Sequence, residues 1–122
     1  MQETDMTNPK DLIGVKKPRL SLVSPAGIIY EALAMGNGAD RYGAFNWRDK
    51  KVQAMIYVEA CMRHLLAWQD GEEIAVDSGV PHLGHAKACL GIIIDALETD
   101  CLIDNRPKKG AAAKVLERYT KQ

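Results

Sequence analysis

All three histidines of this 122-residue chain fall between positions 64 and 85. His82 and His85 stand three positions apart at the expected start of a helix, so both imidazoles lie on one helical face about one turn apart. His64 lies near the end of the preceding helical segment, where it can supply a third nitrogen to a divalent ion held between facing helices. The spacing therefore indicates a metal site. The alternative is that His64 is an ordinary polar residue and that the HLGH turn only caps its helix.

Three carboxylates, Glu72, Glu73 and Asp77, lie between the two histidine-bearing segments. They can complete the shell of an ion or orient an imidazole from outside it. A site of mixed nitrogen and oxygen donors favours cobalt, manganese, nickel or zinc over calcium. The chain has no Walker-type phosphate loop, no G-x-S-x-G and no G-x-G-x-x-G, which leaves serine or cysteine nucleophiles poorly supported. A metal-activated water that attacks a phosphoryl group is the chemistry that matches these residues best.

Several cationic and aromatic side chains are candidates for binding an anion or a base. Arg63, beside His64, offers a planar fork to a phosphate oxygen, and the alternative is a salt bridge to Glu59. The further anion-binding candidates are Lys17, Arg41 and Arg48, each with the alternative that it is simply a solvated charge. Tyr42 and Trp47 can stack on a base, although aromatic residues in a small domain usually fill the core.

Apolar periodicity and cap residues predict helices over about 25 to 36, 49 to 69, 81 to 98 and 111 to 119. Gly36-Asn37-Gly38 is expected to end the first of these. Residues 39 to 48 favour an ordered functional loop or a short helix plus a turn, and no segment shows convincing strand periodicity. The run from 88 to 97 is apolar almost all round, which predicts the most buried element. These features predict an all-α fold, a small bundle of about four helices.

One domain is expected, because a chain of this length with 47% hydrophobic residues can bury one sizeable core. Residues 1–19 are polar and predict an extended N-terminal arm, and residues 20–104 form the predicted all-α domain. Residues 105–122 predict a helical C-terminal tail with too little apolar area to be stable alone, which we expect to dock on a partner subunit.

Composition excludes several classes of partner and compartment. Sixteen basic and sixteen acidic residues balance, so no global field attracts nucleic acid. No apolar run is long enough to cross a membrane, and the polar N-terminus lacks the layout of a signal peptide. The three cysteines are odd in number and form no C-x-x-C pair, which is typical of reduced thiols. We therefore expect a cytoplasmic protein without nucleic-acid or membrane partners.

Four segments together resemble a known family. They are KPRLSLVSP at 17–25, GADRYGAFNWR at 38–48, RHLLAWQDGE at 63–72 and SGVPHLGHA at 78–86. The pattern resembles the phage and bacterial dATP/dGTP diphosphohydrolase family over about residues 16 to 97. The chain departs from that pattern at Arg41, where lysine is usual, and at Ala75 and Asp77, which replace an Asp and a Glu. The loss at position 75 leaves Asp77 and Glu72 as the better carboxylate candidates.

The resemblance implies an all-α fold akin to the MazG-like nucleoside triphosphate pyrophosphatases. These use divalent ions to cut between the α and β phosphates, so dATP and dGTP would give dAMP and dGMP plus pyrophosphate. Carboxylates hold magnesium in that superfamily, whereas this chain has His64, His82 and His85, so cobalt or manganese joins magnesium as a candidate. Proteins of this type resemble enzymes that shape nucleotide pools in phages whose DNA contains 2-aminoadenine. A phage-encoded protein of this kind would act in the host cell cytoplasm. Bundle enzymes of this sort often assemble their sites across subunits, so a homodimer or homotetramer is expected.

The hypothesis gives each candidate residue a role. The metal ligands are His64, His82, His85 and Asp77, with Glu72 as the other carboxylate. The catalytic candidates are Arg63, Glu72 and Asp77. The candidates for binding the deoxypurine nucleoside triphosphate are Lys17, Arg41, Asn46, Trp47 and Arg48. Two alternatives remain open: a non-enzymatic phage accessory protein that binds a nucleotide or metal, and a phosphohydrolase of the histidine-aspartate type. The latter lacks its adjacent His-Asp pair, because His64 precedes Leu65 and His82 precedes Leu83.

Overall fold

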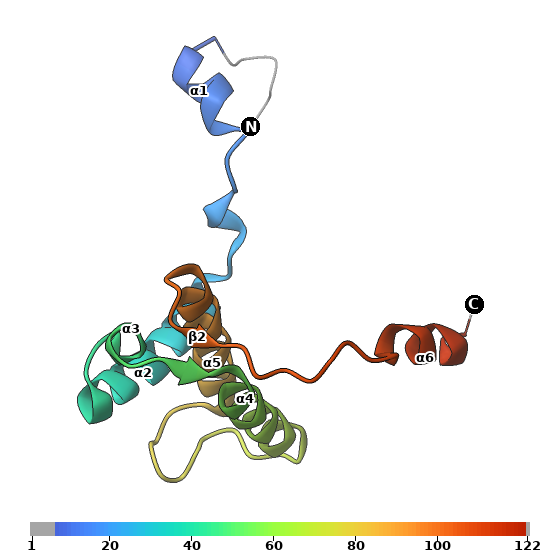
Figure 1. Ribbon diagram of the computed structural model, residues 1–122. Helices are drawn as coiled ribbons and strands as arrows, with labels where there is room; N and C mark the ends of the chain where they lie inside the picture. Colours follow the sequence, from blue (N-terminus) through green and yellow to red (C-terminus); the bar gives the residue numbers. More distant parts are fainter. Residues whose placement is uncertain (1–6, 122) are drawn as a thin grey trace.

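The computed structural model describes residues 7–121, and helices make up most of it (Figure 1). In chain order the elements are α1 (Pro9–Gly14), the 3-10 turn η2 (Leu20–Leu22), α2 (Pro25–Tyr42), α3 (Asn46–Asp49), β1 (Val52–Gln53), α4 (Ala54–Gln69), α5 (His82–Glu98), β2 (Leu102–Ile103) and α6 (Ala112–Tyr119). The two-residue strands pair in parallel, Val52 with Leu102 and Gln53 with Ile103. The all-α prediction is confirmed.

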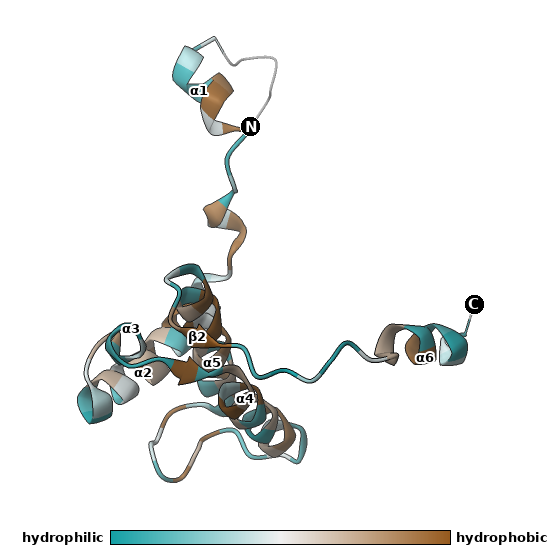
Figure 2. Ribbon diagram, viewed as in Figure 1, coloured by the Kyte–Doolittle hydropathy of each residue, from teal (hydrophilic) through white to brown (hydrophobic). Residues whose placement is uncertain are grey.

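Helix α5 is the centre of the body, with α2 and α4 both packed against it. It is also the most hydrophobic of the three in Figure 2 and has the largest number of buried residues, as predicted. Small side chains allow these helices to approach α5 closely. At Gly84 an added Cβ would lie 3.0 Å from the carbonyl carbon of Tyr30 and overlap its oxygen, so α2 can approach α5 here only because position 84 has no side chain.

The core consists mainly of small side chains. Ala34, Val80 and Ala88 form one buried cluster, and a second consists of Cys61, Ala86 and Cys89. Within residues 7–121 no large side chain is fully buried. Because α2 and α4 lie on different sides of α5, the outer faces of these helices keep many apolar side chains exposed.

Two predicted boundaries were wrong. Helix α2 runs through Gly36-Asn37-Gly38 and ends at Tyr42, where Gly43 adopts a left-handed φ of 92°. Glycine inside a helix costs only about 1 kcal/mol, which the packing of the preceding turn of α2 on α5 and Val80 can offset. The second long helix begins at Ala54 rather than 49 because the residues before it pair as β1. The strands are too short to leave a periodicity in the sequence.

Both ends of the described chain project from the three-helix body (Figure 1). The predicted extended arm contains the short helix α1, whose N-terminus is capped by the side chain of Asn8; residues 1–6 of the arm lie outside the described residues. Helix α6 falls within the predicted helical tail. Among residues 7–121, no helix combines the length and apolar character that crossing a membrane requires.

Candidate functional site

The three histidines lie together where the end of α4 meets the start of α5. The Nδ1 atoms of His64 and His82 are 2.8 Å apart. The rings of His64 and His85 stack with centroids 4.6 Å apart and planes 15° from parallel. The structure therefore brings together the three histidines among the four ligands that the sequence proposed.

The loop between α4 and α5 produces this juxtaposition. Its two arms pair, with the amide of Ala75 donating to the carbonyl of Val80 and the amide of His82 donating to the carbonyl of Glu73, each at 3.0 Å. The Ala75 side chain is buried beneath the turn. The chain thus reverses direction within about ten residues, and Pro81, which has no amide hydrogen to satisfy, precedes the first turn of α5.

Glu72 and Ser78, both in this loop, fix the orientation of two imidazoles. Glu72 Oε1 lies 2.6 Å from Nε2 of the buried His82, and Ser78 Oγ lies 2.7 Å from Nε2 of His85. A carboxylate only accepts, so the Nε2 of His82 carries a proton, and in the neutral ring its Nδ1 lone pair faces His64. A histidine that binds a metal through one ring nitrogen usually donates the N–H of the other to a carboxylate, as His82 does here.

Burial favours the neutral form of two of the imidazoles. It lowers the pKa of His64 and of His85 below the ordinary value of 6.5, and neighbouring histidines lower both further. The charge of Asp77 opposes these shifts at both rings, so this exposed carboxylate lies close enough to act on them. Neutral imidazole is the form that binds a metal ion.

The donor set fits a divalent transition ion, although the shell is not formed. Two nitrogens bound at about 2.0–2.1 Å to one tetrahedral ion are roughly 3.3 Å apart, somewhat more than the 2.8 Å between His64 and His82. Among residues 7–121, no group of three or more His, Cys, Asp or Glu side chains is arranged around one point to hold an ion. The pair of nitrogens and the Glu72 contact fit a metal site, while the third ligand remains a prediction.

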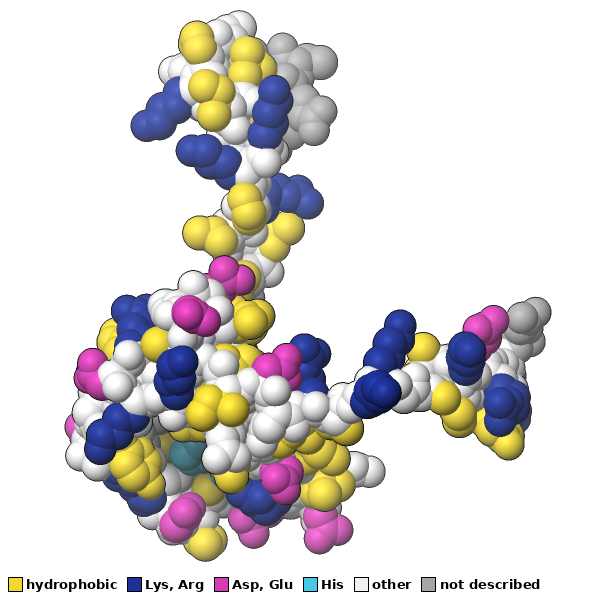
Figure 3. All heavy atoms as spheres, viewed as in Figure 1, with side chains coloured by type: hydrophobic (Ala, Val, Ile, Leu, Met, Phe, Trp, Pro, Cys, Tyr) yellow, Lys and Arg dark blue, Asp and Glu magenta, His cyan; other side chains and the backbone are white. Residues whose placement is uncertain are grey.

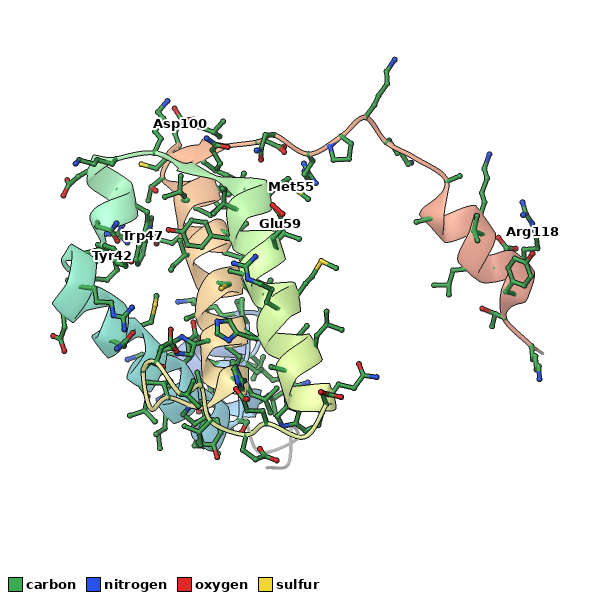
Figure 4. The ribbon with its side chains drawn as sticks, turned by 90° about the horizontal axis from the view of Figure 1, so that it is seen from below. Tyr42, Trp47, Met55, Glu59, Asp100 and Arg118 are labelled. Carbon is green, nitrogen blue, oxygen red and sulfur yellow. The ribbon has the colours of Figure 1, made fainter. Side chains whose placement is uncertain are left out.

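A cavity of about 250 Å³ lies between the second half of α2, α3 and α5 and reaches the histidines at His85. Its walls are mainly apolar and aromatic and include Trp47 and Tyr57, with the polar side chains of Arg41, Asn46 and His85 among them. Figure 4 shows Tyr42 and Trp47 on the side of α5 that carries α2 and α3. The predicted base-binding and phosphate-binding residues Arg41, Asn46 and Trp47 thus share one cavity with a predicted metal ligand.

Asp95 on α5, a residue that the sequence did not single out, holds one wall of this cavity. Its Oδ2 accepts from the indole nitrogen of Trp47 at 2.7 Å, and its two oxygens accept from the guanidinium of Arg48, both at 2.8 Å. These hydrogen bonds lower the pKa of Asp95 to about 2. A signal was available, because Asp95 is the one charged residue in the apolar run from 88 to 97. Arg48 therefore has a carboxylate partner here and lies over the ring of Phe45, 4.3 Å from its centroid.

The remaining predicted site residues lie at different distances from this cluster. Arg63 is exposed on α4, and its charge lowers the pKa of His64, which places it near the histidines. Its alternative partner, Glu59, forms no ion pair with it in the described part of the chain. Lys17 lies on the projecting arm, in a separate groove with Pro9, Ile13 and Arg19. The structure therefore does not bring Lys17 to the cavity.

Comparison with known proteins places this site in a family context. A family model described as dATP/dGTP diphosphohydrolase, N-terminal, matches residues 7–106. A protein of Salmonella phage PMBT28 named dATP/dGTP diphosphohydrolase is 28% identical over 102 residues, which are 84% of this chain and 34% of that protein. The chain thus spans about a third of the length of this curated relative. No solved structure matches it, so the likeness to MazG-like folds stays a prediction.

Proposed function

The chain belongs to the dATP/dGTP diphosphohydrolase N-terminal family, and from this premise we propose that it takes part in metal-dependent hydrolysis of dATP and dGTP to dAMP and dGMP plus pyrophosphate. One observation carries the proposal: the histidine cluster and the aromatic cavity share His85. A reacting phosphate beside the histidines therefore leaves its nucleoside within reach of Trp47 and Asn46.

In this proposal His64 and His82 hold the ion, and His85 or Asp77 completes its shell. A bound divalent ion activates a water and offsets phosphate charge. Glu72 fixes the ring of His82, Arg41 and Arg63 neutralise the triphosphate, and Asp77 takes the proton of the attacking water. The water oxygen bonds to the α phosphorus, the bond from that phosphorus to the bridging oxygen breaks, and pyrophosphate leaves. The chain then acts on the deoxynucleotide pool of a cytoplasm, that of the host if a phage encodes it.

A second candidate is a nucleotide-binding or metal-binding accessory protein without turnover. The observation that favours it is the length of the relative, two thirds of which lies outside the match and can carry the catalytic groups. The pairing of Arg48 with Asp95 also leaves one fewer free cation at the cavity. In this case the histidines act as a structural metal clip, and removing the metal lowers stability without loss of activity.

Product analysis separates the two candidates. Purified protein is incubated with each deoxynucleoside and nucleoside triphosphate, with and without cobalt, manganese or magnesium, and the products are resolved by ion-exchange chromatography. We expect monophosphate and pyrophosphate from dATP and dGTP, abolished by His82→Ala and retained by Glu59→Gln, a matched change on the exposed face of α4. Release of triphosphate would instead indicate chemistry of the histidine-aspartate type. Nucleotide binding by calorimetry without turnover would support the accessory protein.

A further inference from the structure

Helix α6 has an apolar face that nothing else in residues 7–121 covers. Ala112, Val115, Leu116 and Tyr119 recur at helical spacing, and Leu116 and Tyr119 are 71% and 76% exposed. An eight-residue helix is marginal in water unless another surface covers its apolar side. In Figure 1 α6 projects from the body, and it lies beyond the residues 7–106 that match the family model.

Helix α4 has an uncovered apolar stripe of similar spacing. Its other face packs on α5, while Met62, Leu65 and Leu66 point outward with exposed fractions of 55%, 45% and 61%. Positions 62, 65 and 66 follow the same i, i+3, i+4 pattern as positions 112, 115 and 116, and the next position of the α4 stripe is the polar Gln69. The two stripes can therefore pack along their shared apolar turn, with Gln69 at the rim.

The charges around the two stripes are opposite in sign. Residues 108–121 carry Lys108, Lys109, Lys114, Arg118 and Lys121 against one acid, Glu117. Residues 59–77, which include the stripe on α4 and the start of the loop after it, carry Glu59, Asp70, Glu72, Glu73 and Asp77 against one base, Arg63. Figure 3 shows the dark blue side chains on α6 next to its yellow face, and magenta side chains among yellow and some dark blue ones on the lower part of the body. Such complementarity guides one surface to the other and fixes their orientation.

The path of the chain directs α6 away from its own α4 stripe. Residues 104 and 106–110 line a groove with Met55 and Val58 at the start of α4, and the chain then leads away from the body. Figure 4 shows Arg118 far from Met55 and Glu59, which mark the nearest end of α4. Docking within one chain would need a reversal of this segment.

We propose that α6 docks on the Met62–Leu66 stripe of α4 in a second copy of this chain, and that the exchange is reciprocal. The result is a homodimer with two identical helix contacts related by a two-fold axis. In this dimer the two exposed apolar faces cover each other, and the basic and acidic segments of a chain with zero net charge lie side by side. This inference uses residues outside the proposed catalytic groups and stands whether or not the protein hydrolyses nucleotides.

Sedimentation velocity of the full chain across a concentration series, with circular dichroism as the check on folding, tests the proposal. We expect a dimer for the unchanged chain, weakened by high salt because the charged rims are screened. Leu116→Glu and, separately, Leu66→Glu should each raise the dimer dissociation constant on the order of 100-fold, because one buried leucine is worth roughly tenfold and is lost at both contacts. The matched control is Leu20→Glu, which changes a leucine of η2 that is 79% exposed and lies on neither stripe nor on the charged segments beside them.

Three outcomes would overturn the proposal. The first is a chain that stays monomeric at every concentration. The second is a dimer that withstands both leucine variants, because the interface then lies elsewhere. The third is a monomer in which amide hydrogen exchange shows α6 protected, because the helix then docks on its own body. Since Leu66 and Leu116 lie on different elements, agreement between the two variants also excludes unfolding of α6 as the cause.

Discussion

Replacing Gly84 with alanine tests whether α2 and α5 approach as closely as the structure has them. Gly84 lies between His82 and His85, so the contact between Gly84 and the Tyr30 backbone also positions the histidine-bearing turn of α5 relative to α2. An alanine Cβ would lie 3.0 Å from the carbonyl carbon of Tyr30 and overlap the carbonyl oxygen, whereas ordinary contact begins at 3.4 Å. The neighbour is backbone rather than the flexible end of a side chain, so the two helices must separate by several tenths of an ångström.

Comparison with Gly36→Ala isolates the free-energy cost of the clash at position 84. Alanine is favoured over glycine inside a helix by about 1 kcal/mol, and both positions lie within helices. An added Cβ at Gly36 meets nothing within 4 Å, so that variant should show the gain alone. Overpacking at Gly84 costs about 1–3 kcal/mol in addition. The free energies of unfolding of the two variants should therefore differ by about 1–3 kcal/mol, with Gly36→Ala the more stable.

Urea unfolding followed by circular dichroism measures this difference, and thermal unfolding provides a second estimate at roughly 3–5 °C per kcal/mol. Equal stability of the two variants would refute the reasoning, because it would mean that α2 does not contact α5 at Tyr30. A stabilised Gly84→Ala variant would refute it more strongly. The unchanged protein and Gly36→Ala are expected to have the same dependence of unfolding free energy on urea concentration.

Two further predictions concern the site. The pKa values of His64 and His85 are lowered in the folded state, so as the pH falls below 6.5 the unfolded chain binds protons first and the free energy of unfolding decreases; the contribution of these two histidines should be constant above about pH 7.5. Urea titrations at a series of pH values check this, and an unchanged slope in His85→Gln would contradict it. In a chain whose other tryptophan is phenylalanine, Asp95→Ala should expose the indole of Trp47 to acrylamide, because the hydrogen bond that holds it is lost. The control Asp104→Ala, which removes a similar ion pair with Arg106 far from the cavity, should leave quenching unchanged.

The helices were accessible from sequence because their signals are local. Apolar positions at helical spacing marked α4 and α5 to within about five residues, since periodicity depends only on which residues lie on one face of one helix. The same rule misplaced the end of α2, because a Gly-Asn-Gly triplet is unfavourable in an isolated helix, while the packing of the preceding turn on α5 leaves no local signal. Strands β1 and β2 join residues about fifty positions apart and had no local signal.

By itself the sequence determined an all-α chain, three histidines close to the junction of two helices, and a family with which these motifs agree. Only the tertiary structure decided which side chains become the partners of the candidate site residues. Arg48 pairs with Asp95 across 47 positions, and it is the carboxylate of Glu72 rather than that of Glu73 that contacts the imidazole of His82. The physical reason is that a side chain's type and spacing limit what it can do within its own helix. Its partner, and therefore its charge state and its freedom to bind a ligand, depends on which surface the folded chain places opposite it.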